Sequence, residues 1–332
     1  MKDKATKSNK LKVNPIKLGA AKTLAYIQDR ASGKVTSLKT SKSKFNKALL
    51  NGLDWGRILT IAGLPSAGKS TILEEMKRDF LNLNENNFDI LSFEFEMLIE
   101  DQLTRRLASE LGKPVKDIYS ADKPFEDLDK VESILNKISE EPIYYVDEIG
   151  SVDEVEDTIM SFVVNKSMMN NRGLIVTIDH VLLTKGEQGD VEKSIVDNLM
   201  RRLVAIKKKV TAMNVKISFI VLSQLNRDIQ HSDRVLNPNL HFPTKNDIFG
   251  SSSVYQCSDY VLITHRPATI EGIKAYGPRT PQFPKGLPLK HEGRDVIYWH
   301  LIKERFGALK ILAMLEDFKN SRVEEISMSD LN

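Results

Sequence analysis

The chain has little of what marks several classes of protein. Among its 332 residues there is a single cysteine, Cys257, which excludes an internal disulfide and fits a reducing compartment. No run of apolar residues approaches the roughly 20 that a membrane-spanning helix needs, so we expect no membrane partner. The basic residues 1–10 are not followed by an apolar stretch and are therefore not typical of a secretory signal. These absences predict a cytoplasmic protein.

An excess of charge of one sign is also missing. The formal net charge is only +3 at pH 7, so there is no global basic field for nucleic acid, and any such site must be local. Hydrophobic residues make up 41% of the chain, which is enough for a full core. The length allows one large α/β domain with an appendage, or two small domains.

Short β-type runs alternate with helical stretches after about residue 45. This alternation predicts a mostly parallel central sheet with helices on both faces. We expect strands near 57–62, 89–95, 142–147, 173–179, 215–223 and 259–264, helices over 125–141, 151–171 and 190–213, and a closing C-terminal β-hairpin from 296–303 and 308–315 after a Pro- and Gly-rich loop. The expected divisions are a disordered tip (1–15), a helix and extended arm (16–44), the α/β domain (45–318) and a tail (319–332).

One segment fits the phosphate-binding P-loop pattern of two glycines four residues apart followed by Lys-Ser. The expected nucleotide-binding residues are Gly63, Pro65, Ser66, Ala67, Gly68, Lys69, Ser70 and Thr71. A buried strand precedes them and a helix follows, so backbone N–H groups and the helix N-terminus can hold phosphates. Lys69 can reach the β- and γ-phosphates, and the Ser70 hydroxyl can ligate Mg²⁺. The sequence therefore predicts that ATP and Mg²⁺ bind here, the alternative being a coincidental Gly-rich turn.

A P-loop needs an acidic partner for Mg²⁺, usually at the end of a neighbouring strand. Two apolar strands end in suitable residues. The first ends in Asp147-Glu148, which would supply a metal ligand and a general base together, and the second ends in Asp179. Chemistry alone favours the first, and the order of the downstream residues has to decide between them.

Four further segments resemble motifs of the DnaB family of replicative helicases. Residues 93–97 (FEFEM) resemble its FSLEM motif, and 178–183 (IDHVLL) resemble its IDYLQL Walker B segment. Residues 223–227 match its SQLNR motif letter for letter, and 303–307 (KERFG) resemble its KxRxG segment. With the P-loop, five motifs keep the family's order. The resemblance covers roughly residues 16–315, including a helix near 16–31 that resembles the family's linker helix, and it implies a RecA-like P-loop NTPase fold.

The resemblance assigns roles to single residues. It implies that Asp179 ligates Mg²⁺ and that Glu96, at the end of its strand, is the general base, leaving Asp147-Glu148 peripheral. Glu94 then faces the other way by strand alternation and is expected to be solvated or structural. Gln224 would sense the γ-phosphate, unless its amide makes only a structural hydrogen bond.

Lys303 and Arg305 would complete the ATP site of the next subunit from one face of their strand, unless they only protect a sheet edge. The family assembles as a hexameric ring, so the resemblance implies a homo-oligomer in which the N-terminal helix docks on its neighbour. It also implies a bacterial cytoplasm, that of the host if the source is a phage.

The chain departs from the family in two places. There is no room before residue 16 for the family's N-terminal helical domain, so we expect a compact phage- or plasmid-type motor with any primase or loader supplied separately. The segment 247–259, which corresponds to the family's DNA-contacting loop, has Phe249 where an arginine is expected and Gly250 where a glutamate is expected. The candidate DNA-binding residues are Phe249, Gly250, Ser251, Ser252 and Lys185, with Lys207–Lys209 expected to be a solvated helix face.

The leading hypothesis is an ATP-driven, ring-forming DNA helicase that moves on single-stranded DNA, expected 5′→3′, and unwinds duplex. One alternative is a RecA-like recombinase that coats DNA as a filament. The other is a non-motor ATPase related to the helicases, which the altered Phe249-Gly250 segment favours.

Overall fold

The structure is a computed structural model that describes residues 13–49, 51–120, 122–123, 125–181, 184, 191–305 and 309–331. The chain divides into two units, residues 1–37 and 38–332. In the first unit, α1 (Ile16–Ala31) is the predicted N-terminal helix, and none of its residues is buried. It ends at Ser32, and the next residue, Gly33, has a φ of 76°, which a glycine adopts without strain.

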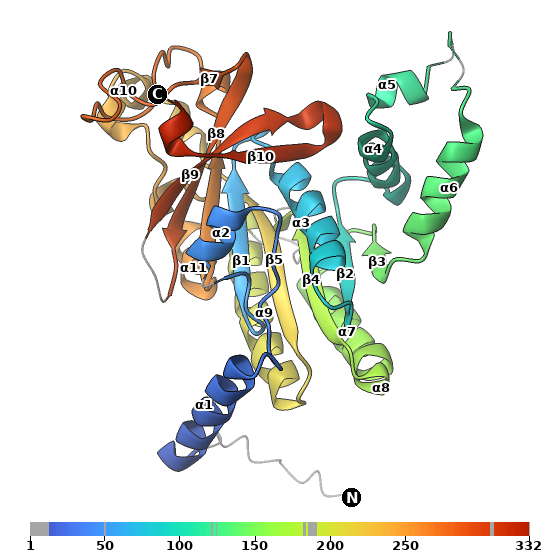
Figure 1. The fold of residues 1–332 in the computed structure, drawn as a ribbon. Coiled ribbons are helices and arrows are strands. Elements are labelled where there is room, and N and C mark those ends of the chain that lie inside the picture. The colour runs from blue at the N-terminus through green and yellow to red at the C-terminus, as the bar shows by residue number, and fades with distance from the viewer. Residues whose placement is uncertain are drawn as a thin grey trace, which may run out of the picture. The chain divides into compact units, whose positions relative to one another are not determined.

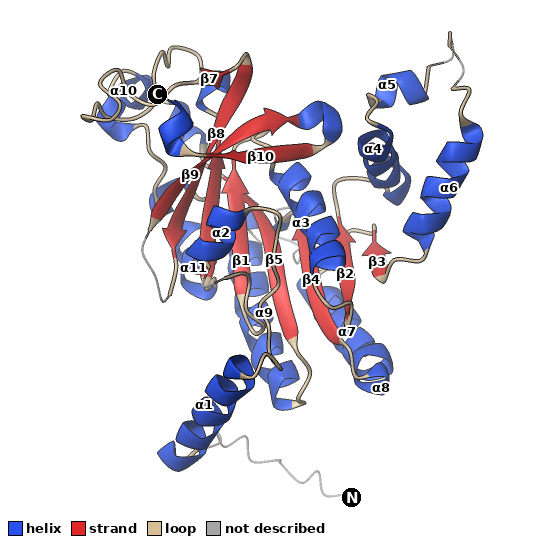
Figure 2. Cartoon of the chain, in the orientation of Figure 1, coloured by secondary structure: helices blue, strands red, loops and turns tan. Residues whose placement is uncertain are grey.

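The second unit is built on one twisted sheet (Figures 1 and 2). Within the described residues the strand order is β10-β9-β8-β6-β1-β5-β4-β2-β3, with a short β7 paired to β8. The pairs from β6 to β3 are parallel, and β6–β8, β8–β9 and β9–β10 are antiparallel. The strands are β1 (Ile58–Gly63), β2 (Phe88–Glu94), β3 (Ile143–Val146), β4 (Gly173–Asp179), β5 (Ile217–Gln224), β6 (Tyr260–His265), β7 (Lys290–His291), β8 (Arg294–Lys303), β9 (Lys310–Asp317) and β10 (Arg322–Ile326).

Helices cover both faces of the sheet. Successive residues of a strand point to opposite faces, and in the central strands the residues on both faces are apolar. On one face, Leu174 and Val176 pack with the buried stripe of α9 (Glu192–Ala212) and with α7 (Val152–Phe162). On the other face, Leu59 and Ile61 pack with α3 (Lys69–Leu83) and α2 (Ser43–Ala48). A strand buried on both faces reads as a continuous apolar run, which is typical of parallel sheets. The predicted architecture is therefore confirmed.

The remaining helices surround the sheet and its two helical layers, and α11 (Ser251–Cys257) packs against α9 through Val254. They are α4 (Ile99–Leu111), α5 (Val115–Ile118), α6 (Leu128–Ser139), α8 (Met168–Asn170), α10 (Ser232–Val235) and α11, and a π-helical turn (Val163–Ser167) joins α7 to α8. In Figure 1, α4, α5 and α6 lie beyond the β2–β3 side of the sheet. No helix in the described ranges is long and apolar enough to cross a bilayer.

The C-terminal region differs from the sequence expectation. The sequence predicts a tail over residues 319–332, yet β10 pairs with β9 and buries Val323. The turn between these strands, η7 (Phe318–Asn320), lies against α3, since Arg78 donates to the Ser321 carbonyl at 2.8 Å. The end of the chain therefore helps to build the region around the P-loop helix. The Pro- and Gly-rich loop packs onto the sheet, because Tyr276 and Phe283 join a third apolar cluster against β8 and β9.

Candidate nucleotide site

The P-loop has the backbone geometry that its sequence predicts. It connects β1 to α3, and Gly68 caps the helix with a φ of 85°. A Cβ on Gly63 would lie 2.8 Å from the Thr264 carbonyl oxygen of the adjacent strand, and a Cβ on Gly68 would lie 2.6 Å from the Phe318 ring. Both positions therefore require glycine for close approach, and Gly68 requires it for conformation as well. The loop is held to β6 by the Thr264 hydroxyl, which donates to the Ala67 carbonyl at 2.9 Å.

The P-loop lysine points back into its own loop. The Lys69 ammonium donates to the carbonyl oxygens of Gly63 and Leu64, each at 3.1 Å. Burial lowers the pKa of Lys69, while the charges of Asp179 and Glu96 act in the opposite direction. A cation held this way is positioned to exchange weak carbonyl contacts for phosphate oxygens.

Asp179 lies beside the P-loop serine. It is the last residue of β4, and its Oδ2 accepts a hydrogen bond of 2.7 Å from the Ser70 hydroxyl. The other oxygen, Oδ1, is buried and has no hydrogen-bond partner among the described residues. Burial and the charge of Glu94 raise the pKa of Asp179 to about 7, despite the Ser70 hydrogen bond. A buried carboxylate oxygen without a partner, next to a hydroxyl, fits the hard oxygen ligands that Mg²⁺ prefers.

The competing pair, Asp147-Glu148, lies elsewhere. It follows β3, which is the outer strand beyond β2, whereas β4 is separated from β1 only by β5. Parallel strands present their carboxyl ends at one edge of the sheet, and the strand nearer to β1 brings its terminal residue closer to the P-loop. The structure therefore brings Asp179, and not Asp147, to Ser70.

Glu96 does not end its strand, which corrects the sequence expectation. β2 ends at Glu94, and Glu96 lies in the following bend with its side chain 59% exposed. Its carboxylate lies 3.9 Å from His180 Nε2. The same imidazole nitrogen lies 3.1 Å from the Gln224 amide nitrogen. Gln224 is the last residue of β5, so Glu96, His180 and Gln224 form a row along the carboxyl ends of the strands. Burial lowers the pKa of His180.

Glu94 is structural and not solvated. Its side chain is 1% exposed, and its Oε1 lies 3.1 Å from the ammonium of Lys77, which is equally buried. Ser92 and Gln102 also donate to the Glu94 carboxylate, at 2.5 and 3.0 Å. Lys77 contacts Glu74 as well. Burial lowers the pKa of Lys77, but the carboxylates of Glu74 and Glu94 outweigh it, so the net shift is upward and the ammonium stays charged.

The two residues expected to complete the neighbouring ATP site, Lys303 and Arg305, are not on one strand. β8 ends at Lys303, whose ammonium donates to the carbonyls of Tyr255 and Gln256, while Arg305 lies past the strand end. The expectation of a shared strand face is therefore wrong for Arg305. Its guanidinium pairs at 2.8 Å with Asp259, yet the side chain remains 49% exposed. Lys207 also pairs with Asp259, at 2.7 Å, so it is not the solvated lysine that the sequence predicts.

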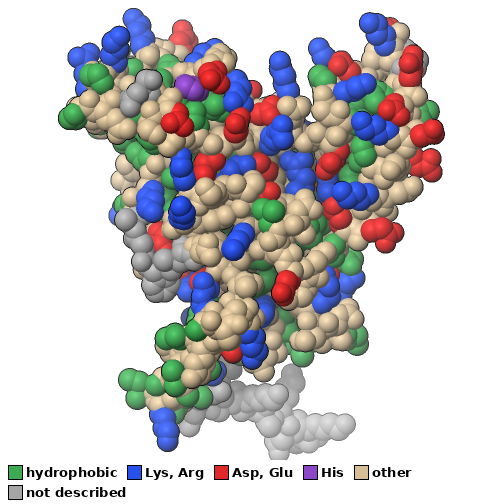
Figure 3. Space-filling view, in the orientation of Figure 1, with side chains coloured by type: hydrophobic (Ala, Val, Ile, Leu, Met, Phe, Trp, Pro, Cys, Tyr) green, Lys and Arg blue, Asp and Glu red, His purple; other side chains and the backbone are tan. Residues whose placement is uncertain are grey.

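The candidate DNA segment is joined to the nucleotide side through the backbone. The Phe249 N–H donates to the Gln224 carbonyl at 3.0 Å, and Leu225 and Ile248 form an antiparallel bridge. Gly250 caps α11 with a φ of 67°. Ser252 is exposed, the side chain of Ser251 is outside the described part, and Lys185 lies outside the described residues. On the face drawn in Figure 3, Lys and Arg side chains are interspersed with Asp and Glu, which agrees with the small net charge.

Sequence reasoning missed three features of the site. Lys77 belongs to no recognisable motif. It does lie on the apolar face of its helix, next to Leu73 and Met76, and a lysine at such a position indicates a buried acidic partner. The sequence gives His180 no role of its own, because it lies inside the segment that resembles the Walker B motif. Phe318 lies against Gly68, and the Arg266 guanidinium carbon is 5.1 Å from the centre of its ring. An aromatic ring beside a phosphate-binding loop offers a surface on which a base can stack.

Known proteins resemble the chain in sequence and in structure. The chain is 26% identical over 263 residues to "Replicative DNA helicase DnaB" of Leifsonia xyli subsp. xyli (strain CTCB07), covering 77% of this chain and 53% of that protein. It therefore spans about half the length of the curated relative that it matches. Two solved structures share the fold. One is described as an ATPase domain, with a TM-score of 0.74, and the other as "The Structure Of A DnaB-Like Replicative Helicase And Its Interactions With Primase", with a TM-score of 0.72.

Each structure is 17% identical to the chain; the alignments cover 95% and 96% of this chain and 100% and 68% of theirs, respectively. These likenesses confirm the predicted RecA-like fold. The family model described as "DnaB-like helicase C terminal domain" matches residues 37–321. One family thus covers most of the chain, and the protein belongs to the DnaB-like helicases through their C-terminal domain.

Proposed function

We propose that this protein is an ATP-driven, ring-forming replicative DNA helicase that moves on single-stranded DNA and unwinds duplex. The observation that carries the proposal is the contact between Ser70 and Asp179, in a chain of the DnaB-like family. Beside this contact, the second Asp179 oxygen has no hydrogen-bond partner in the part of the chain that the structure describes. A recombinase or a non-motor ATPase would also need the P-loop, but family membership favours the helicase.

The chemistry assigned to the site is hydrolysis of ATP. The P-loop N–H groups and Lys69 would bind the phosphates, and Ser70 and Asp179 would hold Mg²⁺, which neutralises charge that develops on the phosphates. The exposed carboxylate of Glu96 would accept a proton from the attacking water. His180 lies between Glu96 and Gln224 and would orient both groups.

Gln224 would report the state of the nucleotide to DNA. Its side chain faces His180, and its backbone carbonyl accepts the hydrogen bond from Phe249 in the candidate DNA segment. Displacement of the strand end by a nucleotide would therefore move Phe249 and Gly250 directly. The DNA contacts we assign are to Phe249, Gly250, Ser251 and Ser252, through backbone N–H groups, hydroxyls and stacking, with Lys185 as a cationic contact.

Assembly into a hexameric ring is the second part of the proposal. Helix α1 exposes the apolar side chains of Ile16, Leu24 and Ile27, which is typical of a helix that packs on a partner. We assign that role to a neighbouring copy of the chain. Arg305 and Lys303 would reach the neighbour's nucleotide in trans, since β8 runs antiparallel to β6 and ends with Lys303 opposite Val261, at the edge of the sheet away from the P-loop. A primase or loader would be a separate protein, and a cytoplasmic location follows from the proposed role.

The first test is steady-state ATP hydrolysis with and without single-stranded DNA. We expect DNA to stimulate hydrolysis, and Lys69→Ala to abolish it because the phosphates lose their cation. Hydrolysis that DNA does not stimulate would favour the non-motor ATPase, for which the uncharged Phe249-Gly250 segment is the supporting observation. Helical filaments in electron micrographs, in place of closed rings, would favour the recombinase.

A mixing experiment tests the contribution in trans. Arg305→Gln and Lys69→Ala subunits are each expected to be inactive alone. If Arg305 serves the neighbouring site, mixed rings contain some sites with an intact Lys69 and an intact neighbouring Arg305, so mixing restores part of the activity. If Arg305 acts only through Asp259 within its own subunit, mixing restores nothing.

A further inference from the structure

The connection between β6 and β8 is much longer than its topology requires. The two strands are neighbours and run antiparallel, and such strands can be joined by a hairpin of about two residues. Here residues 266–293 intervene, all within the described part of the chain, and they include the short strand β7 and one 3₁₀ turn, η6 (Pro267–Thr269). A connection of this length in a compact domain is usually either disordered or functional.

The connection is held in one conformation by its own contacts. Tyr276 and Leu287 form an antiparallel bridge, with N–H to carbonyl distances of 2.8 and 2.7 Å. The Tyr276 hydroxyl lies 2.7 Å from His265 Nδ1 and 2.7 Å from His300 Nε2, which ties the connection to β6 and β8. Four of the residues 278–288 are prolines, whose rings fix φ. Such a loop has little conformational freedom left to lose when it binds a partner.

The net charge of the chain lies in this connection. Of the 48 basic and 45 acidic residues of the chain, the connection contains five and two, which leaves 43 of each kind elsewhere. Figure 3 shows Lys and Arg side chains at the upper left, over the loops around α10 and β7. The molecule as a whole has no basic excess, so a site for a polyanion has to be local, and this connection supplies such a local excess.

Three of the five cations have no partner within the fold. Lys274, Arg279 and Lys285 are exposed, and their side chains make no hydrogen bond or ion pair with any residue that the structure describes. The other two cations both pair with Asp295. Like charges held in one anchored loop repel one another, so the three unpaired cations do not stabilise the fold.

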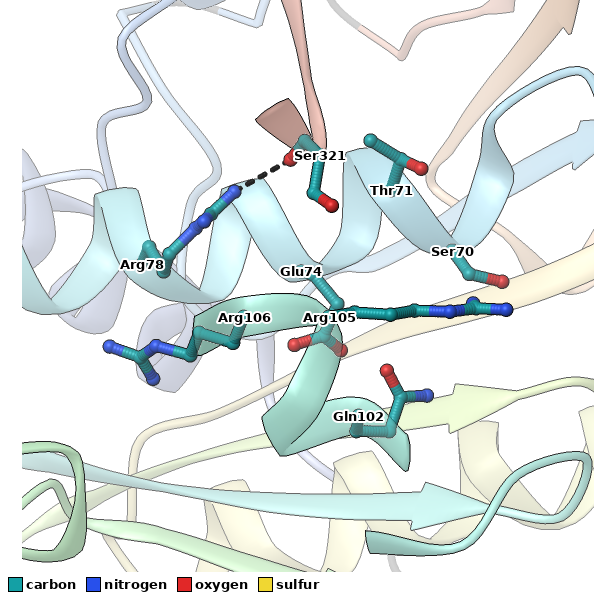
Figure 4. Close-up of a pocket in the computed structure, with 8 residues that line it drawn as sticks. All are labelled: Ser70, Thr71, Glu74, Arg78, Gln102, Arg105, Arg106 and Ser321. Carbon is teal, nitrogen blue, oxygen red and sulfur yellow. Dashed lines mark hydrogen bonds between the residues drawn. The ribbon is translucent and has the colours of Figure 1, made fainter. Parts of the chain in front are cut away.

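Two arginines beside the P-loop helix differ in this respect. Arg78 donates to the Ser321 carbonyl, as Figure 4 shows, and Arg106 pairs with Glu141. These arginines border the nucleotide site and are held by the fold, whereas the three cations of the connection remain available to a ligand.

The connection packs against the segment that leads to the candidate DNA residues. The Gly277 N–H donates to His241 Nδ1 at 3.1 Å, and the ring centres of Tyr276 and Phe242 lie 5.1 Å apart. The stretch that contains His241 and Phe242 continues directly to Phe249. The basic connection and the candidate DNA segment are therefore neighbours in space.

Both lie at the P-loop edge of the sheet. The connection leaves β6 where Thr264 is opposite Gly63 of the P-loop, and the Phe249 N–H donates to the Gln224 carbonyl at the end of β5. In the candidate DNA segment, Phe249 stands where the resembled family has an arginine. Cations that this segment lacks are thus supplied by the connection beside it.

We propose that Lys274, Arg279 and Lys285 form a second DNA-binding surface, which holds backbone phosphates next to the candidate segment 249–252. Lysine and arginine side chains position a nucleic-acid backbone through its phosphates without reading the sequence. Single-stranded and duplex DNA offer the same phosphate chemistry, and the test below separates them. This inference rests on the proposed action on DNA and adds contacts that no sequence motif singled out.

The test is the salt dependence of DNA binding by the full chain. Wild type and Lys274→Gln/Arg279→Gln/Lys285→Gln are titrated against a fluorescent oligo(dT) and a fluorescent blunt duplex at a series of KCl concentrations, with Mg²⁺ and a non-hydrolysable ATP analogue. The slope of log affinity against log salt concentration reports the phosphates neutralised, about 0.7 each for single strands and about 0.9 each for duplex. We expect the triple variant to have a slope shallower by about 2 on the single strand, if the surface holds that form, or by about 3 on the duplex.

Lys208→Gln/Lys209→Gln/Lys216→Gln is the matched control, because it removes the same charge from three exposed lysines. These lysines lie in the last turns of α9 and just before β5, at the edge of the sheet away from the P-loop. The control should leave both slopes unchanged. A second variant of the connection, with each of the two lysines changed to arginine and the arginine to lysine, keeps the charge and should keep the wild-type slope.

Equal slopes for wild type and the triple variant on both forms of DNA would overturn the inference. A change that the control variant reproduces would also overturn it, since total charge would then explain the effect. A triple variant that no longer assembles, with its slope unchanged, would make the surface an interface between copies of the chain and not a DNA site. A wild type that binds neither DNA refutes the proposed function itself, whereas a wild type that unwinds a fork while the triple variant keeps its slope refutes only the second surface.

Discussion

Removing the ammonium of Lys77 should destabilise the protein strongly. Lys77 and Glu94 are each 1% exposed, and Glu74 shares the same ammonium. Replacement of Lys77 by methionine keeps the volume but leaves two carboxylates without their cation. Breaking a buried ion pair by removing one partner costs about 3–5 kcal/mol. Ser92 and Gln102 still donate to Glu94, so we expect a loss near the lower end, about 3 kcal/mol.

The assay is equilibrium denaturation with urea, in which the midpoint and slope give the free energy of unfolding. Lys290→Met is the matched control, because Lys290 is 65% exposed and its ion pair with Asp295 lies at the surface. It should change the free energy of unfolding by less than about 1 kcal/mol. The double variant Lys77→Met/Glu94→Gln should recover at least about 1 kcal/mol, since the uncompensated charge on residue 94 is removed. If Lys77→Met costs no more than Lys290→Met, the reasoning about this buried pair is wrong.

Three further predictions concern the P-loop and two titrating groups. Gly68→Ala should abolish nucleotide binding and lower the free energy of unfolding by about 1–3 kcal/mol, because φ is 85° and the new Cβ meets Phe318. Gly19→Ala is the control: nothing lies within 4 Å of the new Cβ on α1, so urea denaturation should show no loss of stability or a gain. As pH falls below about 7, Asp179 binds a proton that competes with Mg²⁺, so calorimetry should show Mg²⁺ affinity falling about tenfold per pH unit, and Asp179→Asn should lose that dependence. Burial lowers the pKa of His265 to about 3, so between pH 6.5 and 3 only the unfolded chain binds a proton at this residue. As the pH falls through this range, the free energy of unfolding should decrease by roughly 1.4 kcal/mol per pH unit because of His265, which denaturation at a series of pH values measures.

The sheet could be predicted from the sequence because its strands are buried on both faces. The strand expected at 173–179 is β4, residue for residue, and the one expected near 57–62 is β1, shifted by one residue. Continuous apolar runs bounded by turn residues mark such strands clearly. The residues just past the strand ends were harder, since Glu96 and Arg305 lie in bends whose backbone breaks the alternation on which a prediction depends.

The surroundings of a side chain were the least predictable feature. The alternation of side chains along a strand predicts whether Glu94 and Glu96 point to the same face or to opposite faces of the sheet, but it does not predict what packs against Glu94. Its partner, Lys77, lies in the preceding helix, 17 residues earlier in the chain. The same limit applies to Phe318, which lies in the turn between β9 and β10 and approaches Gly68 from a part of the chain far away in sequence. Periodicity therefore predicted elements and faces, while the contacts between elements required the structure.

The most direct test of the helicase proposal is unwinding of a forked DNA duplex with a free 5′ single-stranded arm in the presence of ATP and Mg²⁺. Lys69→Ala serves as the control, because the variant keeps the fold but loses the lysine at the P-loop. We expect wild type to separate the strands, ADP not to support separation, and Lys69→Ala to be inactive. Robust ATP hydrolysis without any strand separation, on forks with either a 5′ or a 3′ arm, would contradict the proposal.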